Sequence, residues 1–339
     1  MSEPLILQER DLGAWWDALR AGGRRIVAPR RDGATVAFGE VASPMEWAAD
    51  VVQTTLSAKE WAFPRCEALL RYRSEGRDVA VEDPVAAPPP TVLFGLRPCD
   101  ARAFGALEAV FNWDTADAPF HRRRRALALV AVGCSRADAD CFCTSTGGGP
   151  GDPAGSDVLL APLGDGRFLV DARTRAGLDL LEAAPSLFAP AGGETITPKL
   201  ADVPRRFDLA VVSRRLGGAF ADDGPWKEMS LRCLGCGACA FVCPACACFD
   251  IQDETGREGG VRLRCWDSCG FAQFTLHTSG HNPREEQYQR WRQRVLHKFS
   301  YMPERLGVTG CTGCGRCARA CPADMGLAEN LAALAEVRS

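Results

Sequence analysis

The spacing of apolar and polar residues predicts an α/β arrangement for the first two thirds of the chain. Residues 10–21 (RDLGAWWDALRA) have apolar side chains at helical spacing, and RRIVAP (24–29) is typical of a short strand. Two apolar runs of strand length, TVLFGL (91–96) and ALALVAVG (126–133), flank a helical pattern at 101–111. Strand, helix and strand in this order predict a βαβ unit in a parallel sheet.

The last third of the chain has a different pattern. REEQYQRWRQRVLHKF (284–299) has helical periodicity, and no segment there alternates apolar and polar residues as a strand would. We therefore predict helices and loops beyond residue 220. LGGAFADDGPW (216–226) has little periodicity and is the predicted linker between a domain at 1–220 and a domain at 221–339.

Composition directs attention to cysteine. The formal net charge of −3 argues against nucleic acid and membrane surfaces as partners. Charged residues near the N-terminus argue against a signal peptide, and the longest apolar run (126–133) is too short to cross a bilayer. We expect a cytoplasmic protein whose 17 cysteines stay reduced, which indicates metal or redox chemistry.

Two copies of one motif account for eight cysteines. CLGCGACAFVCP (233–244) and CTGCGRCARACP (311–322) both follow C-x2-C-x2-C-x3-C-P, the spacing of [4Fe–4S] ligands. In two-cluster ferredoxins the fourth cysteine ligates the other cluster, whereas structural zinc sites use separated C-x2-C pairs. We therefore predict cluster 1 at Cys233, Cys236, Cys239 and Cys321, and cluster 2 at Cys311, Cys314, Cys317 and Cys243.

Four more cysteines lie between the motifs: Cys246, Cys248, Cys265 and Cys269. They could form a further metal site, but CPACAC crowds three thiols together. We favour packing near the clusters as small polarizable side chains. Cys66 is alone in a segment with a helical pattern, and we predict that it is simply packed against its neighbours.

Several segments together carry a family resemblance. They are CLGCGACAFVCPACACFD, RCWDSCGFAQFTLHTSGHNPR, HKFSY and CTGCGRCARACP in the last third, and SAKEWAFPRCEALLRY, LRPCDARAF and VGCSRADADCFCTSTGGGP before it. The chain resembles the iron–sulfur beta subunit of cytoplasmic nickel–iron sulfhydrogenases. It also resembles the A subunit of anaerobic sulfite reductase, a relative, and the sequence does not separate the two. The resemblance implies an electron-transfer subunit between a flavin subunit that uses NAD(P)H and a hydrogenase catalytic module.

The resemblance also implies a further cluster in the first domain. The residues that could hold it are Cys99, Cys134, Cys141 and Cys143. Cys99 and Cys134 each follow a predicted strand, so both would lie at the carboxyl edge of a parallel sheet, where such folds place their ligands. A zinc site and free thiols are the alternatives.

Together these patterns predict an α+β chain, with an N-terminal α/β domain followed by a mostly helical dicluster ferredoxin-like domain. We expect two [4Fe–4S] clusters and a third. No flavin or NAD fingerprint appears, so those cofactors are assigned to partner subunits. The alternative from another class is a zinc-stabilised docking module, which would be colourless.

Overall fold

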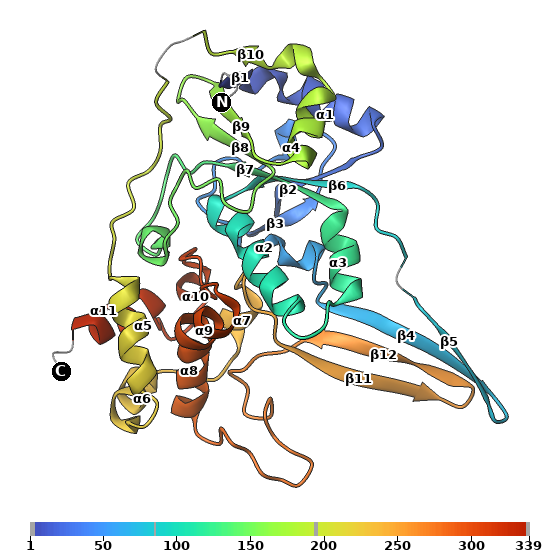
Figure 1. The fold of residues 1–339 in the computed structure, drawn as a ribbon, viewed down its shortest axis with the longest axis vertical. Helices are drawn as coiled ribbons and strands as arrows, with labels where there is room; N and C mark the ends of the chain where they lie inside the picture. The colour runs from blue at the N-terminus through green and yellow to red at the C-terminus, as the bar shows by residue number, and fades with distance from the viewer. Residues whose placement is uncertain (1–3, 85, 193–195, 337–339) are drawn as a thin grey trace.

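Figure 1 shows the computed structural model, which describes residues 4–84, 86–192 and 196–336. Two sheets and many helices give the mixed α and β arrangement that the sequence predicts. Within the described ranges, no helix has the length and apolar character needed to span a membrane.

The larger sheet has eight strands in the order β10-β1-β9-β8-β7-β6-β2-β3. Its centre, β2-β6-β7-β8, is parallel, and its flanking strands are antiparallel. All residues of β6 and β7 are buried, as expected when helices cover both faces of a sheet. The strands are β1 (Leu5–Gln8), β2 (Arg25–Asp32), β3 (Thr35–Glu40), β6 (Thr91–Leu96), β7 (Leu127–Val132), β8 (Val158–Pro162), β9 (Arg167–Ala172) and β10 (Ala189–Pro190).

Helices cover both faces of this sheet. On one face, α1 (Leu12–Ala21) and α4 (Arg175–Glu182) form a core with Val92 and Phe94 of β6. On the other face, α2 (Pro98–Phe111) and α3 (Ala118–Arg125) pack against Leu93. The predicted strand–helix–strand unit is therefore confirmed as β6-α2-β7, with a second helix, α3, between α2 and β7. Helix α2 begins at Pro98, which places Cys99 in its first turn.

A second, antiparallel sheet has the strand order β11-β12-β4-β5, so it pairs two strands of the first two thirds of the chain with two strands of the last third. This sheet extends away from the rest of the molecule in Figure 1. The prediction that the last third lacks strands is wrong. Every residue of β11 is exposed, so no buried face imposes apolar alternation on its sequence. The strands are β4 (Cys66–Glu75), β5 (Asp78–Glu82), β11 (Phe249–Gly256) and β12 (Gly259–Trp266).

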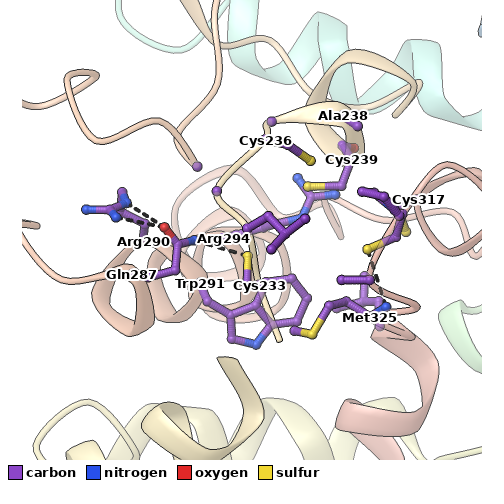
Figure 2. Close-up of a pocket in the computed structure, with 18 residues that line it drawn as sticks. Cys233, Cys236, Ala238, Cys239, Gln287, Arg290, Trp291, Arg294, Cys317 and Met325 are labelled. Carbon is purple, nitrogen blue, oxygen red and sulfur yellow. Dashed lines mark hydrogen bonds between the residues drawn. The ribbon is translucent and has the colours of Figure 1, made fainter. Parts of the chain in front are cut away.

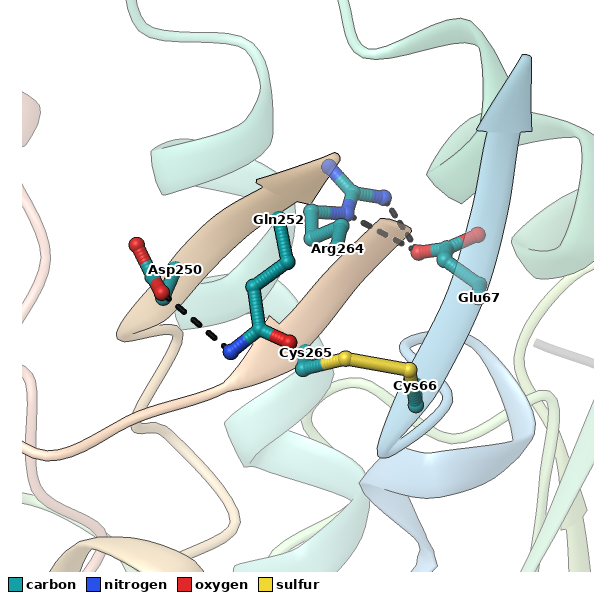
Figure 3. The surroundings of a disulfide bond; sticks show 6 residues. All are labelled: Cys66, Glu67, Asp250, Gln252, Arg264 and Cys265. Atoms are coloured by element: carbon teal, nitrogen blue, oxygen red, sulfur yellow. Dashed lines mark hydrogen bonds and ion pairs between the residues drawn. A yellow bond between two sulfur atoms is a disulfide. The ribbon is translucent and has the colours of Figure 1, made fainter. Parts of the chain in front are cut away.

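Cys66 and Cys265 form a disulfide between β4 and β12 (Figure 3). The prediction that Cys66 lies packed in a helical segment is wrong, because pairing with β12 makes this segment a strand. Cys265 likewise does not pack beside the clusters. The expectation that all 17 cysteines stay reduced is therefore wrong for this pair. Next to this disulfide, Arg264 is 2% exposed and its Nη2 donates to Glu67 Oε1 at 2.6 Å. Asp117, which caps α3, also pairs with Arg264, and Arg123 pairs with Glu67 in the same ion group.

Short helices make up most of the cysteine-rich region, around a third core that contains Trp226, Trp291 and Phe299. The predicted linker is helical at both ends, because it overlaps α5 and α6; the domain boundary itself stays a prediction. A π-helical turn, His297–Tyr301, joins α8 to α9. The helices are α5 (Leu209–Gly218), α6 (Asp223–Ser230), α7 (Ala238–Phe241), α8 (Gln287–Leu296), α9 (Met302–Leu306), α10 (Arg316–Arg319) and α11 (Leu327–Glu336). Single 3-10 turns occur at Glu9–Asp11, Pro44–Glu46, Ala58–Trp61, Cys143–Thr146 and Pro185–Leu187.

Candidate metal centres

The two copies of the cysteine motif fold in the same way. Gly235 and Gly237 have φ angles of 66° and 72°, and the equivalent Gly313 and Gly315 have 65° and 75°. Glycine adopts this left-handed conformation readily, and it lets each loop turn back on itself. Each loop then enters one short helical turn, α7 or α10, that ends two residues before the fourth cysteine.

The first cavity collects cysteines from both motifs. Cys233, Cys236 and Cys239 line it together with Cys321 of the second motif, around an empty volume of about 610 Å³ that includes space open to solvent. In Figure 2 the labelled cysteines of the first motif surround this space, opposite Cys317. Cys236 is exposed, so this cavity reaches the protein surface.

Polar groups hold the sulfur atoms of the first cavity. Gln287 Nε2 donates to Cys233 Sγ at 3.1 Å, and its Oε1 accepts from Arg290 Nε at 3.0 Å (Figure 2). The backbone N–H of Met325 donates to Cys321 Sγ at 3.3 Å. Hydrogen bonds to cysteine sulfur are among the contacts that set the potential of an iron–sulfur cluster.

The second cavity is smaller, with an empty volume of about 290 Å³, and it also draws on both motifs. It is lined by Cys311, Cys314 and Cys317 together with Cys243 of the first motif. Cys317 lines both cavities, so the two are neighbours. The structure therefore groups the eight cysteines as the predicted ligand exchange requires; ligation itself stays a prediction.

Two buried cations line the second cavity. Lys298 is 3% exposed, and its Nζ donates to Cys243 Sγ at 3.3 Å. Arg294 lines both cavities and donates to the Cys239 carbonyl at 3.0 Å. Burial works to lower the pKa of each cation, but the surrounding cysteine sulfurs outweigh it and raise both pKa values. Permanent positive charge here suits the negative charge of thiolate-bound clusters, so the residues present fit that group.

The four N-terminal cysteines also come together. Because β6 and β7 are parallel neighbours, Cys99 and Cys134 lie at the same sheet edge, as the sequence predicts. Electrostatic contacts join Cys134 to Cys99, Cys141 and Cys143. Burial raises the pKa of all four thiols, that of Cys134 to about 11. That they hold a cluster stays a prediction.

The N-terminal site is packed directly against the second motif. The backbone N–H of Phe142 donates to the Gly313 carbonyl at 2.9 Å, and a Cβ on Gly313 would lie 2.5 Å from the Phe142 carbonyl carbon. Arg316, inside the motif, pairs with Asp100, which follows Cys99. Only glycine permits this backbone approach, so Gly313 serves the contact as well as the turn.

Sequence reasoning missed the charged residues of the site: Arg294, Lys298 and Arg316. A pattern that could have revealed Arg294 and Lys298 lies in α8 and the turn that follows it. Trp291, Arg294, Val295 and Lys298 are spaced as one buried helix face, and a charge on such a face implies a buried partner.

Three remaining cysteines, Cys246, Cys248 and Cys269, line a third cavity. Among the residues that the structure describes, no three His, Cys, Asp or Glu side chains are grouped closely enough to hold a single metal ion.

Comparison with known proteins is consistent with this geometry. Residues 232–325, which contain both motifs, match the family model of the 4Fe-4S dicluster domain. Over 335 residues the chain is 30% identical to sulfhydrogenase 2 subunit beta of Pyrococcus furiosus. The alignment covers 93% of this chain and 92% of that protein. No solved structure matches the chain. The chain therefore belongs to the family of sulfhydrogenase beta subunits, iron–sulfur proteins with a [4Fe–4S] dicluster domain.

Proposed function

We propose that this electron-transfer subunit relays electrons between a flavin subunit that uses NAD(P)H and a nickel–iron hydrogenase catalytic module. The observation that carries the proposal is the exchange of fourth cysteines: Cys321 of the second motif lines the first cavity, and Cys243 of the first motif lines the second. A zinc module of separate C-x2-C pairs would not need this exchange.

We assign cluster 1 to Cys233, Cys236, Cys239 and Cys321, and cluster 2 to Cys311, Cys314, Cys317 and Cys243. A bound [4Fe–4S] cluster supplies reversible transfer of one electron. The chain's own residues hold the ligands and set their surroundings: Gln287 and the Met325 N–H donate to sulfur, and Lys298 and Arg294 supply buried positive charge.

We assign a third cluster to Cys99, Cys134, Cys141 and Cys143. Support comes from their common sheet edge and from the contact between Phe142 and Gly313, which joins this segment to the second motif. Since Cys317 lines both motif cavities, the contacts favour a row of three sites, with the N-terminal site and cluster 1 at its ends.

Anaerobic reconstitution with ferrous iron and sulfide tests the ligand assignment. Two cubanes predict about eight irons and eight sulfides per chain, and three predict about twelve of each. Cys66→Ser is the matched control, because Cys66 lies outside all the proposed sites, and it should leave both values unchanged. A colourless protein that contains zinc and no labile sulfide would contradict the proposal.

Affinity purification of the tagged chain from its own cells tests the partners. We expect nickel and flavin to co-purify with it in the cytoplasmic fraction. Siroheme in place of nickel would contradict the hydrogenase assignment and favour a sulfite reductase.

A further inference from the structure

The third cavity has no role in the proposed electron relay. Its empty volume is about 1170 Å³, including space open to solvent, and it lies between the end of α2, the loop 245–248 and α8. Three cysteines outside all the assigned clusters face it: Cys246, Cys248 and Cys269. All three are free thiols, whereas the fourth cysteine of the insertion is bonded to Cys66.

Two of these thiols form a hydrogen-bonded pair. The side chains of Cys248 and Cys269 are in hydrogen-bond contact, and a bond from the Asp267 N–H to the Cys248 carbonyl (3.0 Å) ties the two segments together. Cys248 is half-buried and Cys269 is buried. Both cysteines line the cavity, and Cys248 is the more accessible of the two.

This arrangement suits thiol–disulfide exchange. An attacking thiol must be accessible and ionise readily, and a resolving thiol must reach the same sulfur. The hydrogen bond between the pair lowers the pKa of Cys248 and raises that of Cys269, which gives the accessible sulfur the greater thiolate character.

The cavity walls indicate the charge of a ligand. Arg284, Arg294, Lys298 and Arg305 line the cavity, and none of its described lining residues is acidic. Trp113 and Phe274 add aromatic surface. A small molecule with negative charge and some apolar character therefore fits best.

We propose that Cys248 and Cys269 form a redox-active dithiol that reduces small anionic disulfides in this cavity. The Cys248 thiolate attacks one sulfur of R–S–S–R, which forms a mixed disulfide and releases one thiolate. Cys269 then loses its proton to solvent and attacks the Cys248 sulfur, which releases the second thiolate. The substrate gains two electrons, and the cysteine pair becomes a disulfide. No cluster takes part in this step, so it does not rest on the proposed relay.

The probe is 5,5′-dithiobis(2-nitrobenzoate), an anionic disulfide, added anaerobically to the reconstituted full chain. A fast phase should release two coloured thiolates per chain, and peptide mass spectrometry should find a Cys248–Cys269 cross-link. Cys269→Ser should release one thiolate and keep one aryl group on Cys248. Cys248→Ser should slow the fast phase about tenfold or more. The control double variant Cys66→Ser, Cys265→Ser removes the other cysteine pair without freeing a thiol, and it should leave this phase intact.

Three results would overturn the proposal. One is an equal fast phase in the Cys248→Ser variant. Another is a peptide map in which the probe leaves both cysteines unmodified. The third is zinc or iron that is lost from Cys248→Ser while the cubane absorption stays constant, which would make these cysteines metal ligands. Missing clusters would contradict the relay but leave this test readable, because peptide mapping reports each thiol separately.

Discussion

Replacing Asp100 by Asn should destabilise the junction between the N-terminal site and the second motif. Arg316 and Asp100 have side chains that are each 1% exposed. Their contact is bidentate, with Nη1 2.5 Å from Oδ1 and Nη2 2.9 Å from Oδ2. Gln53 and Thr54 accept the remaining guanidinium hydrogen bonds. All three guanidinium nitrogens of Arg316 thus donate, and Asp100 is the carboxylate that neutralises it.

The size of the effect follows from this burial. Asparagine keeps the shape of Asp100 but removes its charge, and its amide group would face a guanidinium donor. Breaking a buried pair from one side costs about 3–5 kcal/mol. That corresponds to a loss of roughly two to four powers of ten in the folding equilibrium constant. The measurement is the free energy of unfolding from anaerobic urea titrations, at equal cluster content.

Two further variants complete this test. Asp17→Asn breaks the exposed pair with Arg20, in which the Asp17 side chain is 80% exposed, and should cost less than about 1 kcal/mol. The double variant Asp100→Leu, Arg316→Met buries no charge and should recover much of the loss. A cost for Asp100→Asn as small as that of the surface control, or a double variant no more stable than the single one, would refute the reasoning.

Further predictions concern the ligands and one histidine. Cys321→Ser should remove cluster 1 and spare cluster 2, with a loss of about four irons per chain, and Cys243→Ser should do the reverse; paramagnetic resonance of the reduced variants showing both centres intact would rule out the exchange. Cys141→Ser should also remove about four irons if the N-terminal four hold a cluster, and an unchanged iron content would contradict that. Partial loss of hydration where His297 lines the third cavity, and then Lys298, lower the pKa of His297 below its ordinary value of 6.5. The unfolded chain therefore binds this proton more readily, so the stabilising contribution is present above pH 6.5 and is lost as pH falls through the folded pKa. His297→Asn should flatten the stability profile between about pH 5 and 7 in urea titrations; an unchanged slope would contradict this.

How far the site could be predicted depends on the distance over which each contact acts. The spacing of Cys233, Cys236 and Cys239 is local, and glycines within the same loop produce its turn. Placing Cys321 in the same cavity required the precedent of two-cluster ferredoxins, because Cys321 lies 82 positions after Cys239 in the sequence. The contact of Lys298 with Cys243 could not be predicted from local spacing, since the two residues lie on different segments of the chain.

In the fold, too, features set by the local sequence could be predicted, and features set by distant segments could not. Runs such as 91–96 and 126–133 were recognisable because strands buried on both faces are apolar throughout. The strand β11 was not, because all its residues are exposed and its pairing with β12 defines it. Cys66 was assigned to the wrong element for a related reason: its strand and its disulfide both depend on β12, almost two hundred residues away in the sequence.

The sequence by itself determined the chemistry of this protein: two local cysteine motifs, the left-handed glycines within them and the apolar strands of the α/β sheet. The tertiary structure decided which cysteines share a cavity, which pair with each other and which cations are buried beside them. Ligand spacing acts within a dozen residues, so composition and order encode it directly. Burial, charge pairing and strand register arise only when distant segments meet, and the chain encodes them through the whole of its packing.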